Sequence, residues 1–239
     1  GAFTNPNKQV RQEAIDLTRK AIDALKEINS NLLTIWLGQD GFDYGFQVDY
    51  KKIWDDEINA LKQIAEHDKE CMISIEYKPN EPRAYSLLSN LGTTLLAIKE
   101  INLNNLGVTI DFAHILYSNE QPALVAALID KHSQILGLHL NDGYGKRDDG
   151  LMVGSVHQLA TIELLYHITK SKYQGPIYFD TFPDTTNMDP IKECELNIST
   201  VIQQLKLVDK LIKNNELTSA IENQDSITSH RIFNSILYS

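Results

Sequence analysis

The chain has 239 residues, enough for one large α/β domain or two small ones. Its net charge of -10 argues against a general nucleic-acid binder and against a protein that rests on an anionic membrane surface. No run of about 18 apolar residues is present, so no transmembrane helix is expected. Two cysteines, Cys71 and Cys194, are too few for a disulfide framework and favour a reducing, cytoplasmic setting.

Helices and strands are predicted to alternate along the chain. The first helix begins after Thr4-Asn5-Pro6, where a capping side chain precedes a proline and apolar residues then recur at three- and four-residue steps. Further helices are expected at about 50–67, 84–101, 121–133, 156–169 and 189–213. Apolar runs that suit buried parallel strands lie at 32–37, 72–76, 107–111, 135–140 and 176–180.

This alternation predicts parallel strands joined by right-handed crossovers. Every strand carries polar residues at its C-terminal end, where a (β/α)8 barrel builds its sites, whereas a doubly wound sheet would gather them at one switch point. We therefore predict an α/β fold, a partial (β/α)8 TIM barrel over residues 1–213 with about five β/α units and the first three strands absent. Two short helical stretches, at 216–222 and 226–237, are predicted to form a C-terminal helical extension over residues 214–239.

Four strand ends carry side chains that could bind a metal ion. Glu76, Asp111, His139 and Asp180 each close a successive strand. A charge at the end of a buried strand is unfavourable, by an amount on the order of several kcal/mol, unless it is paired. Three carboxylates and one imidazole suit Mn²⁺, Mg²⁺ or Co²⁺ better than a thiolate site would. One such residue alone would more often form a salt bridge at the rim, but four in register favour a shared metal ion.

A second metal ion could lie beside the first, with Asp111 as a bridge. His114 lies three residues after Asp111, and Asp148 and Asp149 lie in the polar loop after His139. The spacing leaves two other interpretations open. His114 could be a loop histidine that caps or packs, and the two aspartates could belong to a solvated turn.

Two further residues could contact a substrate. Lys78 lies two positions after Glu76, so it points to the same face if the strand continues, and it could polarise a carbonyl oxygen. A salt bridge to Glu76 or Glu81 is the alternative role for Lys78. Trp36 lies at the end of the first strand and could form the wall of a sugar-sized pocket or pack in the core.

The motifs that contain these residues resemble a known family. Glu76-Tyr-Lys-Pro-Asn-Glu-Pro82 is similar to the Glu-x-Lys-Pro-Asn-Glu-Pro signature of xylose isomerase-like barrels. Together with three later motifs it more closely resembles the bacterial L-rhamnose isomerase-type branch; these are Thr109-Ile-Asp-Phe-Ala-His114, His139-Leu-Asn-Asp142 and Tyr178-Phe-Asp180. The resemblance runs from about Thr4 into the tail, where residues 222–231 also look like that branch.

The resemblance implies an isomerase that interconverts aldoses and ketoses such as L-rhamnose and its ketose. It further implies two divalent metal ions per site, often Mn²⁺, and a homo-oligomer in full-length members. By matching positions, the first ion would be held by Glu76, Asp111, His139 and Asp180. The second ion would be held by Asp111, His114 and either Asp148 or Asp149.

The same matching implies roles around the sugar. Lys78 would hydrogen-bond the oxygen at the carbonyl end of the substrate, and Asp180 would take part in catalysis as well as binding metal. Apart from this matching, we also expect Trp36 and Asp142 to contact the substrate. The chemistry could be a hydride shift between C1 and C2 or a proton transfer through an enediol, and the sequence leaves both routes open.

One departure from the family bears on activity. The family's ring-opening histidine comes from early strands that this chain lacks, so we expect a fragment with weak isomerase activity on its own. Three alternatives remain: a ketose 3-epimerase of the same superfamily, a metal-dependent endonuclease, and a non-catalytic fragment that binds metal or sugar. The epimerase would use two glutamates where this chain has Asp180, and the endonuclease would need a basic groove that a net charge of -10 does not favour.

Overall fold

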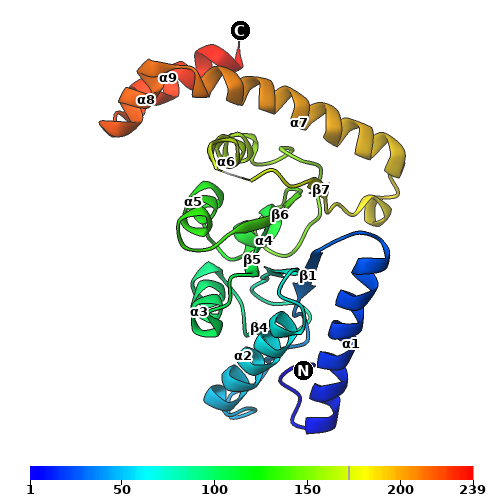
Figure 1. The fold of residues 1–239 in the computed structure, drawn as a ribbon. Helices are drawn as coiled ribbons and strands as arrows, with labels where there is room; N and C mark the ends of the chain where they lie inside the picture. The colour runs from blue at the N-terminus through cyan, green and yellow to red at the C-terminus, as the bar shows by residue number, and fades with distance from the viewer. Residues whose placement is uncertain (172, 239) are drawn as a thin grey trace.

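The computed structural model describes residues 1–171 and 173–238, and its centre is one parallel five-stranded sheet (Figure 1). The strands lie side by side in the order in which they occur along the chain: β1 (Leu32–Trp36), β3 (Met72–Glu76), β5 (Leu106–Asp111), β6 (Ile135–Leu140) and β7 (Ile177–Phe179). The register pairs Trp36 with Glu76 and Asp111 with His139. The polar strand ends therefore meet at one edge of the sheet, as the sequence predicts.

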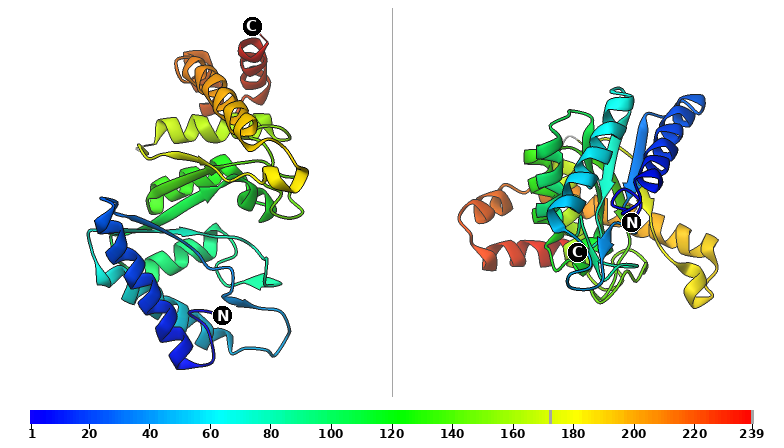
Figure 2. Two further views of the ribbon diagram at one scale, coloured as in Figure 1. Left: turned by 90° about the vertical axis from the view of Figure 1, so that its right-hand side faces the viewer. Right: turned by 90° about the horizontal axis from the view of Figure 1, so that it is seen from below.

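Helices connect successive strands and lie around the outside of the curled sheet (Figures 1 and 2). The connecting helices are α2 (Tyr50–His67), α3 (Leu91–Ile101), α5 (Pro122–His132) and α6 (Gln158–Lys170), and α1 (Lys8–Glu27) precedes β1. Because the strand order equals the chain order, right-handed crossovers place these helices on the same face of the sheet. The result is a half-barrel, which confirms the predicted α/β fold of the TIM-barrel type.

The core lies between the sheet and these helices. The apolar face of α2 buries Leu61 and Ile64 completely, and β3 buries Ile73 and Ile75 completely. Both faces of β3 and β5 are covered, and the two buried hydroxyls within these strands, those of Ser74 and Thr109, hydrogen-bond each other at 2.6 Å. Packing on both sides fixes the two strands that carry Glu76 and Asp111.

The structure corrects the predicted helix at 84–101. The helix begins only at Leu91, because Asn90 and Thr93 form a capping box in which the Asn90 side chain accepts a hydrogen bond from the Thr93 backbone N–H at 2.9 Å. The preceding residues instead contain β4 (Tyr85–Ser86), which pairs antiparallel with β2 (Gly41–Phe42). In the chain, β2 follows β1 and β4 follows β3.

A short helix that was not predicted, α4 (Phe112–Tyr117), begins directly after β5. Asp111 caps it by accepting a hydrogen bond from the backbone N–H of His114 at 3.0 Å. The cap brings Asp111 and His114 onto the same turn of chain, so both can face the strand ends.

The C-terminal part of the chain folds over α6. A 3-10 turn (Pro183–Thr186) leads into α7 (Pro190–Ile212), α8 (Asn215–Glu222) and α9 (Ser226–Leu237). Leu217 of α8 and Ile232 of α9 belong to the same apolar core as the strands. The boundary between the predicted regions 1–213 and 214–239 stays a prediction. Position 172 of the first region and position 239 of the second lie outside the described residues.

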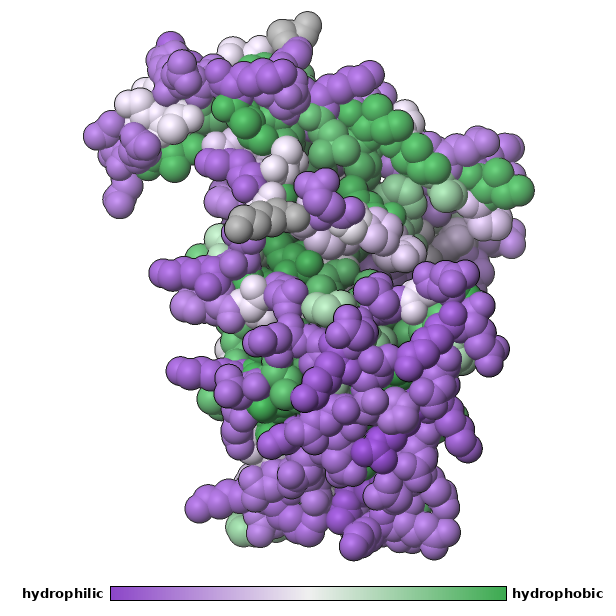
Figure 3. All heavy atoms as spheres, in the orientation of Figure 1, coloured by the Kyte–Doolittle hydropathy of each residue, from purple (hydrophilic) through white to green (hydrophobic). Residues whose placement is uncertain are grey.

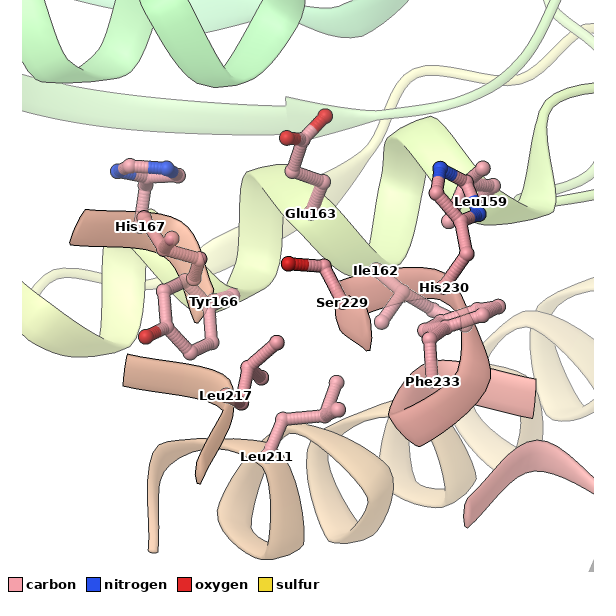
Figure 4. A pocket seen from close by; sticks show the side chains of 11 residues that line it. Leu159, Ile162, Glu163, Tyr166, His167, Leu211, Leu217, Ser229, His230 and Phe233 are labelled. Carbon is pink, nitrogen blue, oxygen red and sulfur yellow. The ribbon is translucent and has the colours of Figure 1, made fainter. Parts of the chain in front are cut away.

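A cavity of about 270 Å³ lies between α6, α7, α8 and α9 (Figure 4). Apolar side chains such as Leu211, Leu217 and Phe233 line it, together with Glu163 and His230 at its polar parts. This cavity shares no residue with the polar strand ends, so it is separate from the site described below.

Apolar side chains also remain exposed on α7, where Figure 3 shows a hydrophobic stretch along the helix. Ile191, Ile198 and Ile202 lie on this helix and are exposed. Within the described residues, β1 and β7 have no strand partner on their outer sides. In the same part of the chain, no helix is both long and apolar enough to cross a bilayer.

Candidate metal centre

The four predicted ligands of the first metal ion come together at the carboxyl ends of β3, β5, β6 and β7. Each offers one ligand atom, and these atoms all lie within 4.8 Å of one another; the residues are Glu76, Asp111, His139 and Asp180. Glu76 and Asp111 are buried, while the Asp180 side chain is 41% exposed. The cluster is therefore shielded from solvent at β3 and β5 and accessible to solvent at β7.

His139 provides the test of whether these residues fit a cation. Its Nδ1 is buried and makes no hydrogen bond to any described residue. The same atom lies 3.4 Å from Glu76 Oε1, 3.8 Å from Asp111 Oδ2 and 3.9 Å from Asp180 Oδ2. A buried nitrogen without a hydrogen bond that faces three carboxylates is the arrangement that a bound divalent ion would satisfy. The residues fit a metal ion with oxygen ligands and one nitrogen.

The electrostatics of the cluster follow from burial of like charges. Burial raises the pKa of Asp111 to about 6, with nearby Glu76 adding to the rise and His114 opposing it. Burial and the charge of Glu76 also raise the pKa of Asp180. Burial lowers the pKa of His139, but the carboxylates of Glu76, Asp111 and Asp180 outweigh it and leave the pKa above its ordinary value. Burial therefore disfavours the charged forms of Asp111 and Asp180, and a nearby cation would favour them.

A second group of polar side chains lies next to the first. His114 Nε2 is 3.1 Å from Asp148 Oδ2, and His114 Nδ1 lies 3.5 Å from Glu76 Oε1 without a hydrogen bond to any residue in the described ranges. Asp148 Oδ1 is also buried without a hydrogen-bond partner there. Although burial lowers the pKa of His114, Asp111 and Asp148 raise it to about 9. Asp148 has a lowered pKa because His114 and Lys78 outweigh its burial.

Lys78 contributes the fixed positive charge of this group. Its Nζ donates to Asp148 Oδ2 at 3.0 Å and forms an ion pair with Glu81 Oε2 at 3.1 Å. Burial lowers the pKa of Lys78, but Asp148 and Glu81 raise it by more. Lys78 Nζ also lies 5.4 Å from the centre of the Trp36 ring, a cation–π distance. Trp36 is half-exposed and so forms a wall beside Lys78.

The structure places Asp149 and Asp142 elsewhere. Asp149 accepts hydrogen bonds from Arg147 Nε and from the backbone N–H of Tyr144, both at 2.8 Å, and so holds its own loop. Asp142 is fully buried, and its carboxylate accepts hydrogen bonds from the backbone N–H groups of residues 143, 156 and 157. The His157 ring contacts the same carboxylate at 2.9 Å. These bonds give Asp142 a structural role in the loop before α6 and leave it no free oxygen for a substrate.

Two residues at the site had no role predicted from the sequence. The Tyr178 ring meets the His139 ring edge to face at 5.7 Å. Asn141 is fully buried, and its side chain contacts Asp111. Both residues lie inside motifs that the sequence analysis used, Tyr178 two positions before Asp180 and Asn141 two positions after His139. The alternation of side chains along a strand was a signal that could have identified them.

Known proteins are similar to this chain in sequence. A xylose isomerase of Thermus thermophilus is 27% identical over 186 residues, which cover 75% of this chain and 48% of that protein. A probable sugar isomerase of Mesorhizobium japonicum is 26% identical over 220 residues, which cover 88% of this chain and 50% of that protein. The chain thus spans about half the length of the curated relatives it matches.

Solved protein structures share the fold of this chain. A crystal structure of a D-tagatose 3-epimerase-like protein superposes with a TM-score of 0.73 at 21% identity, over 88% of this chain and 75% of that one. Residues 1–223 match the sequence pattern of a single family, and this match covers both the half-barrel and α8. The chain belongs to the xylose isomerase-like TIM barrel family.

Proposed function

We propose that this chain carries the metal-binding part of a divalent-metal-dependent sugar isomerase that interconverts an aldose and its 2-ketose. The observation that supports this most is the buried Nδ1 of His139, which faces three carboxylates and makes no hydrogen bond to a described residue. Mn²⁺ is the first candidate, with Mg²⁺ and Co²⁺ as alternatives, because the ligand set is rich in oxygen and has no thiolate.

In this proposal Glu76, Asp111, His139 and Asp180 hold one ion. Asp111, His114 and Asp148 hold a second ion beside it, and Asp148 is favoured over Asp149 because its Oδ1 is buried without a partner in the described chain. When bound, such ions act as Lewis acids on adjacent sugar oxygens.

The proposed substrate contacts lie beside the metal ligands. Lys78 hydrogen-bonds the oxygen at the carbonyl end of the sugar and is held in place by Asp148 and Glu81. The half-exposed ring of Trp36 packs against the C–H face of the sugar. In the reaction one hydrogen moves between C2 and C1 of the sugar while a proton moves between their oxygens, so that aldose and ketose are isomers.

L-Rhamnose is the first sugar to test, because the motifs around the ligands resemble the L-rhamnose isomerase-type branch. The working enzyme in this proposal contains further β/α units that cover the outer sides of β1 and β7 and the exposed apolar residues of α7. We expect weak turnover by the described chain alone, because Asp180 and Trp36 are half-exposed and the site does not exclude water.

Metal binding gives the first test. The wild-type chain should bind Mn²⁺, and His139→Gln should weaken binding by about 100-fold or more, a larger effect than the loss of an outer-shell partner. Isothermal titration calorimetry measures both values. The matched control is His132→Gln, because His132 is exposed at the end of α5. Equal affinities in wild type and His139→Gln would contradict the proposed site.

The affinity for Mn²⁺ should fall as the pH is lowered. In the metal-free chain the pKa of His139 lies above its ordinary value and that of His114 is about 9, while metal-bound imidazole must be deprotonated. Binding therefore releases protons, and the Kd should decrease from about pH 6 to about pH 8.5. Calorimetry in buffers of different ionisation enthalpy counts the protons. A Kd that does not change with pH, with no proton release, would show that these imidazoles are not ligands.

Product analysis decides the reaction class. With Mn²⁺ present, L-rhamnose should be converted slowly to its 2-ketose, and Lys78→Met should lower kcat/KM by roughly 100-fold because one positioned donor is lost. Lys99→Met, which changes an exposed lysine of α3, is the control. Epimerisation of a ketose at C3 without aldose formation would favour the 3-epimerase instead. Metal binding without any turnover would favour the non-catalytic fragment.

A further inference from the structure

A single amide side chain connects three of the strand ends that form the metal site. Asn141 directly follows β6 and is fully buried. A buried amide is unfavourable unless its polar atoms are hydrogen-bonded. Here every polar atom of the side chain has a partner, and each partner lies in or next to a residue of the proposed site.

The two N–H groups of Asn141 Nδ2 are shared among three oxygens. This nitrogen lies 3.2 Å from both carboxylate oxygens of Asp111 and 3.0 Å from the backbone carbonyl oxygen of Asp180. On the other side of the amide, Oδ1 accepts a hydrogen bond from the backbone N–H of Ala113 at 2.8 Å. Asn141, just after β6, therefore connects the end of β5, the start of α4 and the end of β7.

These partners fix the orientation of the amide. A flipped side chain would turn its oxygen towards the Asp111 carboxylate and its N–H groups towards the Ala113 N–H, and both contacts would be repulsive. Neither an aspartate nor an apolar residue could supply two donors and one acceptor in this geometry. The position thus requires an amide of this length.

The contact to Asp111 Oδ2 matters most for a bound ion. Asp111 Oδ1 already accepts a hydrogen bond from the His114 backbone N–H. Oδ2 lies 3.8 Å from the unpaired Nδ1 of His139, so it faces the centre of the ligand cluster. In the described part of the chain, Asn141 donates the one hydrogen bond that Oδ2 accepts. Without this bond the oxygen could rotate away from the cluster.

The contact to Asp180 supports the least secure ligand. β7 has three residues and lies at the edge of the sheet, and the Asp180 side chain is 41% exposed. The hydrogen bond from Asn141 holds the backbone of Asp180 against the buried end of β6. This bond restrains the backbone from which the exposed Asp180 carboxylate extends.

We propose that Asn141 is a positioning residue, which orients the Asp111 carboxylate and anchors the Asp180 backbone so that both can bind the same divalent ion. This inference rests on the proposed function, because it assumes that these carboxylates bind metal. Hydrogen-bond partners of metal ligands typically change metal affinity by about 10–100-fold when they are removed. Asn141 should act in this way without touching the ion.

The chain offers a closely matched control. Asn105 is also buried, and its Nδ2 donates to three backbone carbonyl oxygens, those of Ala65, Asp68 and Cys71. It lies just before β5, whereas Asp111 lies at the other end of this strand. Loss of either amide should reduce stability, but only loss of Asn141 should affect metal binding.

The experiment compares the wild type, Asn141→Leu and Asn105→Leu. Mn²⁺ affinity is measured by calorimetry, and the absorption spectrum of bound Co²⁺ reports the ligand geometry. We expect Asn141→Leu to raise the Kd for Mn²⁺ by about 10–100-fold and to change the Co²⁺ spectrum. Asn105→Leu should lower the midpoint of thermal unfolding but keep the wild-type Kd and spectrum. Asn141→Ala, measured in the same way, replaces Asn141→Leu if the leucine variant does not fold.

The possible failures are distinguishable. If the wild type does not bind Mn²⁺, the metal site is wrong and this inference falls with it. If the wild type binds Mn²⁺ and the folded Asn141 variant has the same Kd and spectrum, the metal site stands and the positioning role is wrong. Equal losses of affinity in the Asn141 and Asn105 variants would also overturn the positioning role, because they would reflect stability alone.

Discussion

Negative charge buried at the ends of two central strands is the constraint on which the rest of this site depends. Glu76 and Asp111 are almost fully buried, so their carboxylates lose the hydration that they would have in water. The burial of Asp111 raises its pKa to about 6, because burial disfavours the charged form of the carboxylate. A cation that several carboxylates share removes this penalty, and the surrounding residues are arranged around such a cation.

The arrangement follows from the order of the strands. Because strands adjacent in the chain are adjacent in the sheet, the residues that close β3, β5, β6 and β7 lie next to one another. The cap of α4 then turns His114 towards Asp111, and Lys78 balances Asp148 beside them. The fold thus produces a ligand cluster and a neighbouring polar group that could contact a sugar.

Much of this could be predicted from the sequence, because parallel strands and their polar ends have a local signal. The five strands followed from apolar runs, and the convergence of Glu76, Asp111, His139 and Asp180 followed from the four runs that end in a possible ligand. The helix expected at 84–101 was too long, since its apolar residues continue through a loop that the Asn90 cap excludes from the helix. Such a cap competes with helical periodicity, and only the folded chain shows which of the two prevails.

The roles of the loop residues could not be predicted for a related reason. Asp142, Asp148 and Asp149 are equivalent in charge and close in sequence, but they differ in the hydrogen bonds that the folded loop gives them. Asp142 and Asp149 are taken up by backbone N–H groups, and Asp148 faces His114. No role was predicted for Asn141 because a neutral amide does not itself suggest a metal ligand, although its place two residues after His139 was a usable signal.

The most direct test of the central claim is a crystal structure of the chain grown with Mn²⁺, with anomalous diffraction used to locate the ion. The account predicts an anomalous peak at about 2 Å from ligand atoms of Glu76, Asp111, His139 and Asp180. A fully formed cluster without a peak, or a peak held by other residues, would contradict it.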